Sequence, residues 1–170
     1  MQEVTIRHEM ACDEDTYWYK CVFDKDYNEQ LYLKLLGFPQ YELEKYEDDG
    51  ETIRRVVKAS PKIPPLPGPV KKVIGEGLAY TESGSFPRST RQYTFTAVPN
   101  ALGDKATTAG KMWVEKVGDK RIARIAKISV EVKVFMVGGL IEDQILNSLR
   151  TSYERAVDFT NQWVKDKGYC

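Results

Sequence analysis

The hydrophobic positions near the end of the chain repeat at steps of three and four residues over residues 138–167. The apolar stripe comprises Ile141, Ile145, Leu149, Tyr153, Ala156, Phe159 and Trp163. Charged and amide side chains fill the opposite face, so the pattern predicts one amphipathic helix. At about 1.5 Å per residue this helix is roughly 40 Å long, and its stripe requires an apolar surface of similar length.

Alternating apolar and polar positions predict strands through most of the remaining chain. The cleanest alternation, over residues 4–10, places Val4, Ile6, His8 and Met10 on one face. Six further strand patterns cover residues 41–47, 51–60, 77–83, 90–98, 107–117 and 121–136. Turn residues separate them, as at Asp48-Asp49-Gly50 and Gly118-Asp119, which favours antiparallel hairpins.

Two short helices are expected between the first strand and the second. Acidic residues 13–15 suit a helix start and predict a helix over residues 14–23. A second helix, over residues 26–36, is ended by Gly37 and Pro39. Residues 61–69 hold five of the eight prolines and predict a stiff loop, with one helical turn following at residues 70–74.

Length and charge limit the function classes. A chain of 170 residues is most simply one domain, residues 1–170. Lysine plus arginine equals aspartate plus glutamate at 25 each, which argues against a nucleic-acid partner. There is no signal-peptide pattern, and the three cysteines lack metal-type spacing. We therefore expect a cytoplasmic monomer with free thiols.

The order of elements resembles the START-like, or helix-grip, superfamily, which includes birch-pollen allergen, polyketide cyclases and lipid-transfer domains. Three segments carry the likeness: residues 93–96 (YTFT), 130–142 (VEVKVFMVGGLIE) and 159–163 (FTNQW). More narrowly, the chain resembles a bacterial START-like family of uncharacterised function. The resemblance implies an α+β helix-grip fold, in which a strongly curved antiparallel sheet of about seven strands wraps the long helix. It also implies a cavity between the two that takes an apolar ligand, and it transfers no catalytic residue.

Two polar residues on apolar strand faces are candidate ligand anchors. Arg124 shares a face with Ile122 and Ala126, where an unpaired charge costs several kcal/mol. Either it grips an acidic head group, or the strand frays and the guanidinium reaches water. His8, the only histidine, is either a hydrogen-bonded wall residue or a catalytic base.

Aromatic and hydroxyl side chains, together with one leucine of the long helix, suggest a wall for a hydrophobic ligand, although aromatic residues in a strand are more often ordinary core. The candidates are Tyr93, Thr94, Thr96, Trp113, Leu149 and Tyr153.

The loop after the third strand mixes apolar side chains with lysines. Ile63, Leu66 and Ile74 could dip into an anionic membrane beside Lys71 and Lys72, and the alternative is a solvated loop packed on its own domain. We expect the ligand entrance at this loop and at the start of the long helix.

Enzyme motifs are missing from the sequence. One histidine excludes the common multi-histidine zinc sites, and no other metal, cofactor or catalytic set is recognised. From the cavity that the resemblance implies, we expect non-enzymatic binding, and possibly transfer, of a lipid or other hydrophobic small molecule. Two alternatives stay open: a cyclase-, dehydratase- or hydrolase-like enzyme on the same fold, and a protein-interaction module whose cavity is filled.

Overall fold

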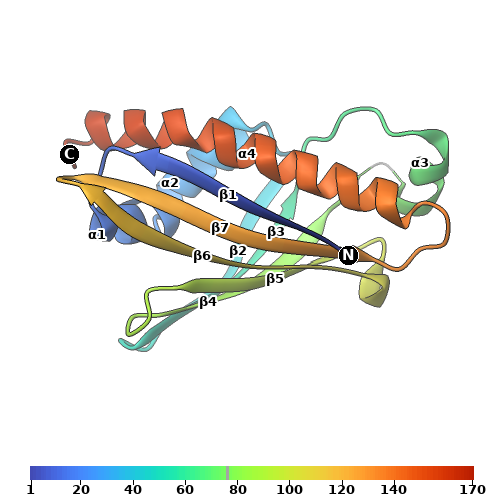
Figure 1. Ribbon diagram of the computed structural model, residues 1–170, viewed down its shortest axis with the longest axis horizontal. Coiled ribbons are helices and arrows are strands. Elements are labelled where there is room, and N and C mark those ends of the chain that lie inside the picture. The colour runs from blue at the N-terminus through green and yellow to red at the C-terminus, as the bar shows by residue number, and fades with distance from the viewer. Residues whose placement is uncertain (76) are drawn as a thin grey trace.

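The long C-terminal helix is anchored at its start to the end of the last strand. The computed structural model describes residues 1–75 and 77–170, and it has α4 at Gly138–Asp166 (Figure 1). A Cβ at Gly138 would collide with the carbonyl oxygen of Val132, so only glycine permits this close approach. The buried carboxylate of Glu142 accepts the backbone N–H of Val132 at 2.8 Å. The predicted helix is confirmed.

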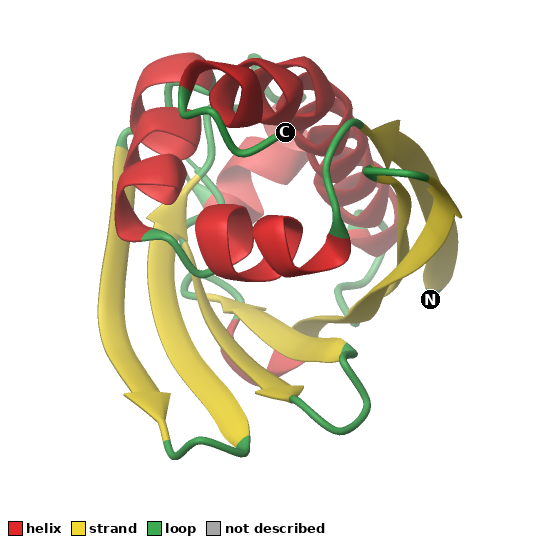
Figure 2. Ribbon diagram, turned by 90° about the vertical axis from the view of Figure 1, so that its left-hand side faces the viewer, coloured by secondary structure: helices red, strands yellow, loops and turns green. Residues whose placement is uncertain are grey.

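Seven strands form one antiparallel sheet. They are β1 (Gln2–Met10), β2 (Gln40–Asp48), β3 (Thr52–Ser60), β4 (Tyr80–Pro87), β5 (Tyr93–Pro99), β6 (Ala106–Gly118) and β7 (Arg121–Val132). Their order is β1-β7-β6-β5-β4-β3-β2, so the first strand pairs with the last and β2 forms the far edge. The sheet curves around the helices (Figure 2), and α4 packs on β1 and β7. The predicted helix-grip fold is confirmed.

The two predicted short helices are present, and each widens from α-helical into π-helical turns. The first comprises α1 (Glu14–Tyr17) and η1 (Trp18–Val22), and the second α2 (Lys25–Glu29) and η2 (Gln30–Leu35). Asp13 and Asp24 cap them by accepting the backbone N–H groups of Thr16 and Tyr27 at 2.8 and 2.7 Å. The chain also has α3 (Gly68–Ile74) and the 3-10 turn η3 (Gly103–Lys105).

The last strand is shorter than its alternation predicts. We expected it to reach residue 136, but β7 ends at Val132, whose partner Ala106 is the first residue of β6. With no further strand to pair with, the chain turns towards α4. Met136 has a positive φ of 67° and is 84% exposed, so its expected place on the core face is wrong.

Other strand bounds moved by a few residues. The patterns at residues 77–83 and 90–98 correspond to β4 and β5, which begin three residues later and end later than predicted. No helix in residues 1–75 and 77–170 is long and apolar enough to cross a bilayer.

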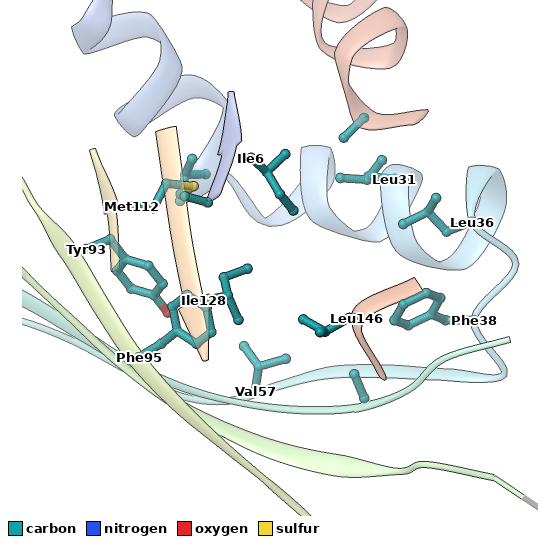
Figure 3. Packing of buried hydrophobic residues seen from close by; sticks show 14 of the residues in the cluster. Ile6, Leu31, Leu36, Phe38, Val57, Tyr93, Phe95, Met112, Ile128 and Leu146 are labelled. Atoms are coloured by element: carbon teal, nitrogen blue, oxygen red, sulfur yellow. The ribbon is translucent and has the colours of Figure 1, made fainter. Parts of the chain in front are cut away.

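Buried side chains face one another from the sheet and from the helices. Figure 3 shows Tyr93, Phe95 and Met112 on the sheet side, with Leu31 and Leu36 from the end of the second short helix. Leu146 joins this cluster from α4. The fold therefore encloses an interior between the concave face of the sheet and the helices.

Candidate functional site

A cavity of about 150 Å³ lies in this interior. Its walls come from the two short helices, from the concave faces of β3 to β7 and from α4. The α4 wall is a stripe at helical spacing formed by Ile145, Ser148, Leu149, Ser152, Tyr153 and Ala156. The helix that shields the core thus leaves part of its apolar stripe facing open space.

The volume limits what the cavity holds as it stands. An apolar protein cavity of about 150 Å³ accepts a molecule the size of benzene, whereas pockets for drug-sized ligands measure roughly 300–1,000 Å³. The present shape therefore suits one aromatic ring with a short substituent. A long acyl chain requires the walls to move.

Tyrosines dominate the polar part of the wall. Six of the ten tyrosines line the cavity: Tyr17, Tyr27, Tyr32, Tyr80, Tyr93 and Tyr153. Burial raises the pKa of each of these phenols, so all six are neutral at physiological pH. They supply flat apolar faces together with hydroxyl groups that donate or accept hydrogen bonds.

Arg124 extends from β7 into the cavity and is 4% exposed. Its Nη2 donates to Nδ1 of His8 and to the carbonyl oxygen of Tyr153, both at 3.0 Å. The guanidinium lies 4.6 Å from the centre of the Tyr153 ring, within cation–π range. Its Nε is buried and has no hydrogen-bond partner among the described residues.

The charge of Arg124 persists despite its burial. Burial alone would lower the pKa of Arg124, but the hydroxyls of Tyr17 and Tyr153 more than offset this and raise it above its usual value. His8 responds in the opposite sense, because burial and the neighbouring guanidinium lower its pKa, against a smaller raising effect of Glu154. The pair is thus a charged arginine beside a neutral imidazole.

A second polar group is built on β3, β4 and β5. The hydroxyl of Tyr93 accepts from Nε of Arg55 at 3.0 Å and donates to Oε1 of Glu82 at 2.8 Å. Nη2 of Arg55 also lies 3.9 Å from Oε1 of Glu82, and Nη1 donates to the carbonyl oxygen of Val22 at 2.7 Å. In contrast to Arg124, this arginine has a carboxylate partner.

Two glycines make room for the aromatic rings on the concave face. A Cβ at Gly84 would overlap the phenol end of Tyr93, at 2.6 Å from Cε2 and closer still to Cζ and Oη. A Cβ at Gly110 would lie 2.5 Å from Cζ of Phe95. Tyr93 and Phe95 lie flat against the sheet because these positions have no side chain.

Comparison with known families adds an assignment to this geometry. The family described as "Protein of unknown function (DUF2505)" matches residues 5–164, nearly the whole chain. The chain belongs to DUF2505. No curated protein matches it.

Solved structures show the same fold as this DUF2505 chain. TTHA0849 from Thermus thermophilus is similar at a TM-score of 0.67 and 15% identity, covering 98% of this chain and 99% of the other. A START superfamily protein from Mycobacterium smegmatis has a TM-score of 0.56 at 15% identity, with coverage of 93% and 98%. Norcoclaurine synthase from Thalictrum flavum has a TM-score of 0.57 at 15% identity, with coverage of 92% and 86%. The DUF2505 chain therefore has the START-like fold of these structures.

The structure brings four of the eight predicted wall residues into the DUF2505 cavity. Tyr93, Arg124, Leu149 and Tyr153 line it. His8 stands behind Arg124, directly opposite it in the β1–β7 register, and contributes its ring nitrogen to that guanidinium.

The other three predicted wall residues lie on the outer face of the sheet. Thr94 and Thr96 are exposed, because Tyr93 and Phe95 take the inward positions of β5. Trp113 is half-buried and sits directly opposite Ile125, one step out of phase with the inward-facing Met112. Their placement in the cavity wall was therefore wrong.

The loop residues proposed for membrane contact do not form one exposed apolar and basic surface, as that proposal requires. Ile74 is only 4% exposed and packs in the core, so it does not reach a membrane, and Leu66 is half-buried against the same core. Ile63 is half-buried, while Lys71 and Lys72 are exposed. Of the proline-rich loop, it is Pro61 that lines the cavity.

Sequence reasoning missed Arg55 and Glu82. Arg55 stands between the buried residues Ile53 and Val57 on the apolar face of β3, the same signal that identified Arg124. Glu82 gave a weaker signal, because its face of β4 continues into Gly84. In the described chain, no group of three or more His, Cys, Asp or Glu side chains is arranged to hold a metal ion.

Proposed function

We propose that this DUF2505 protein binds a hydrophobic small molecule in the cavity between the curved sheet and α4. The observation that carries the proposal is the cavity itself, with mainly apolar and aromatic walls and a few buried polar groups. This combination is typical of small-molecule sites, in which burial provides affinity and polar groups fix the orientation. The open interior argues against an interaction module whose own side chains fill the space.

A structural neighbour supports aromatic guests. Norcoclaurine synthase from Thalictrum flavum has been solved in complex with dopamine and hydroxybenzaldehyde, and its TM-score with this chain is 0.56 at 15% identity. Both of those ligands consist of one ring with short substituents, the size that suits the present cavity. A compact ring is therefore favoured over a lipid with long acyl chains.

The proposal is tested with the neutral probe p-cresol and a variant that fills the cavity. Ala156→Leu adds three carbon atoms to the α4 wall, where Ala156 is 5% exposed. We expect titration calorimetry to show p-cresol binding to the natural protein and at least about 10-fold weaker binding to the variant, because the guest loses its space. Ala101→Leu, at an exposed turn, is the matched control.

Native mass spectrometry of the purified protein provides a second readout. A co-purifying compound of low mass, released by denaturation and absent from Ala156→Leu, is the expected result. Binding of p-cresol that is equal in Ala156→Leu and Ala101→Leu would place the guest outside the cavity and refute the proposal.

The second candidate function is catalysis in the same cavity, favoured by the Glu82–Tyr93–Arg55 group. A carboxylate that borders a small-molecule cavity is placed to abstract a proton next to a carbonyl group. The test is deuterium incorporation from D₂O into 4-phenyl-2-butanone, followed by NMR. Exchange that Glu82→Gln abolishes supports an enzyme, and exchange no faster than in buffer rejects this candidate.

A further inference from the structure

We propose that the ligand is a small aromatic monoanion, whose negative charge supplies the counter-ion that Arg124 lacks. This inference rests on the proposed function, since it names the class of molecule that the same cavity takes. Three features carry it: the unpaired charge of Arg124, the net charge of the cavity wall and the size of the space.

The hydrogen bonds of Arg124 satisfy donors without balancing charge. The two acceptors of Nη2, Nδ1 of His8 and the carbonyl oxygen of Tyr153, are neutral, and so is the Tyr17 phenol that also interacts with the guanidinium. Within residues 1–75 and 77–170, no carboxylate lies within 4.0 Å of the guanidinium, and Nε has no partner. An arginine does not escape burial by losing its proton. The charge therefore remains uncompensated on the cavity wall, a costly arrangement in a protein interior.

The remaining charged groups set the charge of the ligand. Among the described residues that line the cavity, only Arg55, Glu82 and Arg124 are charged. Arg55 and Glu82 already contact each other and share the Tyr93 hydroxyl. Two guanidinium groups and one carboxylate leave a net charge of +1, so one negative charge on the ligand balances the wall.

The neighbours of Arg124 and the volume define the rest of the molecule. The Tyr153 ring covers one side of the guanidinium, and the apolar side chains of Leu149 and Ile145 precede it along the α4 stripe. A space of about 150 Å³ accepts one ring and a short acidic arm. A fatty acid carries the same single negative charge, but its acyl chain is too long for this cavity.

The experiment compares ligands that differ only in charge or only in shape. Phenylacetate is the anion, phenylacetamide its neutral isostere, phenethylamine a cation of similar size and decanoate an anion with an acyl chain. Titration calorimetry is carried out on the natural protein, on Arg124→Met and on Arg121→Gln. The last removes an exposed arginine of the same strand.

We expect the natural protein to bind phenylacetate about 10- to 100-fold more tightly than phenylacetamide, the range given by charge-assisted hydrogen bonds. Phenethylamine and decanoate bind more weakly than phenylacetate. Arg124→Met abolishes the preference for the anion while retaining phenylacetamide, and Arg121→Gln leaves the preference unchanged. If Arg124→Met does not fold, the ratio of phenylacetate to phenylacetamide in the natural protein decides alone.

Failure of this inference and failure of the proposed function give different results. Equal affinities for phenylacetate and phenylacetamide, with p-cresol also bound, overturn the proposal that the ligand is an anion. They leave unchanged the proposal that the cavity binds a hydrophobic small molecule. Tighter binding of decanoate than of phenylacetate overturns the proposal that the ligand is an aromatic molecule. Binding of none of the compounds, p-cresol included, overturns both proposals.

Discussion

Gly84→Ala is expected to displace the aromatic side chain that joins Arg55 to Glu82. The new Cβ would lie 2.6 Å from Cε2 of Tyr93, and closer to Cζ and Oη, whereas carbon atoms in contact are about 3.5–4.0 Å apart. Tyr93 is 3% exposed and packs face to face with Phe95 at 5.9 Å between ring centroids. The ring therefore cannot keep its present position beside Gly84, and a shift towards the cavity would break its contacts with Phe95, Arg55 and Glu82.

The cost follows from what the ring loses. Overpacking of a core costs about 1–3 kcal/mol, and each hydrogen bond between the Tyr93 hydroxyl and a charged partner contributes about 1.5–3 kcal/mol. Replacing glycine by alanine returns about 0.4–1 kcal/mol through the unfolded chain. Partial relaxation retains some of the contacts, so we expect a net loss of about 3 kcal/mol in the free energy of unfolding. For a chain of 170 residues this lowers Tm by about 6–12 °C.

Urea unfolding followed by circular dichroism measures this loss. Gly139→Ala is the matched control, because a Cβ at this position in the first turn of α4 meets nothing within 4 Å. The control is expected to be neutral or more stable by about 0.5–1 kcal/mol. In a Tyr93→Leu background the cost of Gly84→Ala should fall below about 1 kcal/mol, because the overlapping phenol end is gone. A Gly84→Ala protein within about 0.5 kcal/mol of the natural one, or an unchanged cost in the Tyr93→Leu background, would refute the reasoning.

Three further predictions concern groups away from that contact. Burial and Arg124 lower the pKa of His8 in the folded protein, so the unfolded chain takes up the proton first as pH falls below 6.5, and the free energy of unfolding declines there. The ring C–H signal of His8 in NMR should therefore titrate with a midpoint below 6.5. A midpoint at or above 6.5 contradicts the placement of His8 beside Arg124. Only Cys170 should react with iodoacetamide in the native protein, since the other two thiols are buried and burial raises the pKa of Cys12 to about 12. Mass spectrometry should show one label before unfolding and three labels after it. A second label in the native protein contradicts this prediction. Glu142→Leu should lose about 1–3 kcal/mol of unfolding free energy, because the buried backbone N–H of Val132 in β7 loses the carboxylate that accepts it at 2.8 Å. Unchanged stability in urea would show that this contact does not anchor α4.

Local patterns predicted the architecture because the fold follows closely from periodicity. The three- and four-residue repeat defined α4, and alternation placed Arg124 among inward-facing apolar residues. The alternation also continued past Val132, where the strand ends for lack of a pairing partner, and this led to the error at Met136. The pattern shows which residues share a face, but a neighbouring strand is required to show where pairing stops.

The candidate site was only partly predictable, because it depends on register between strands. Arg55 lies opposite Gly84, and Gly84 lies opposite Phe95, so the polar group and the space for its aromatic ring arise from pairing across three strands. Trp113 was assigned to the wall as an aromatic residue in a strand, but the register places it opposite Ile125 on the outer face. No pattern within one strand contains this information.

The central claim is that a small aromatic molecule occupies the space beside α4. Isotope-filtered NOE spectroscopy tests it most directly, with labelled protein and unlabelled p-cresol. The account predicts contacts from the p-cresol ring and methyl group to the methyl groups of Ile145 and Leu149, which line the cavity. Contacts only to exposed side chains such as Leu140, or none at saturating p-cresol, would contradict it.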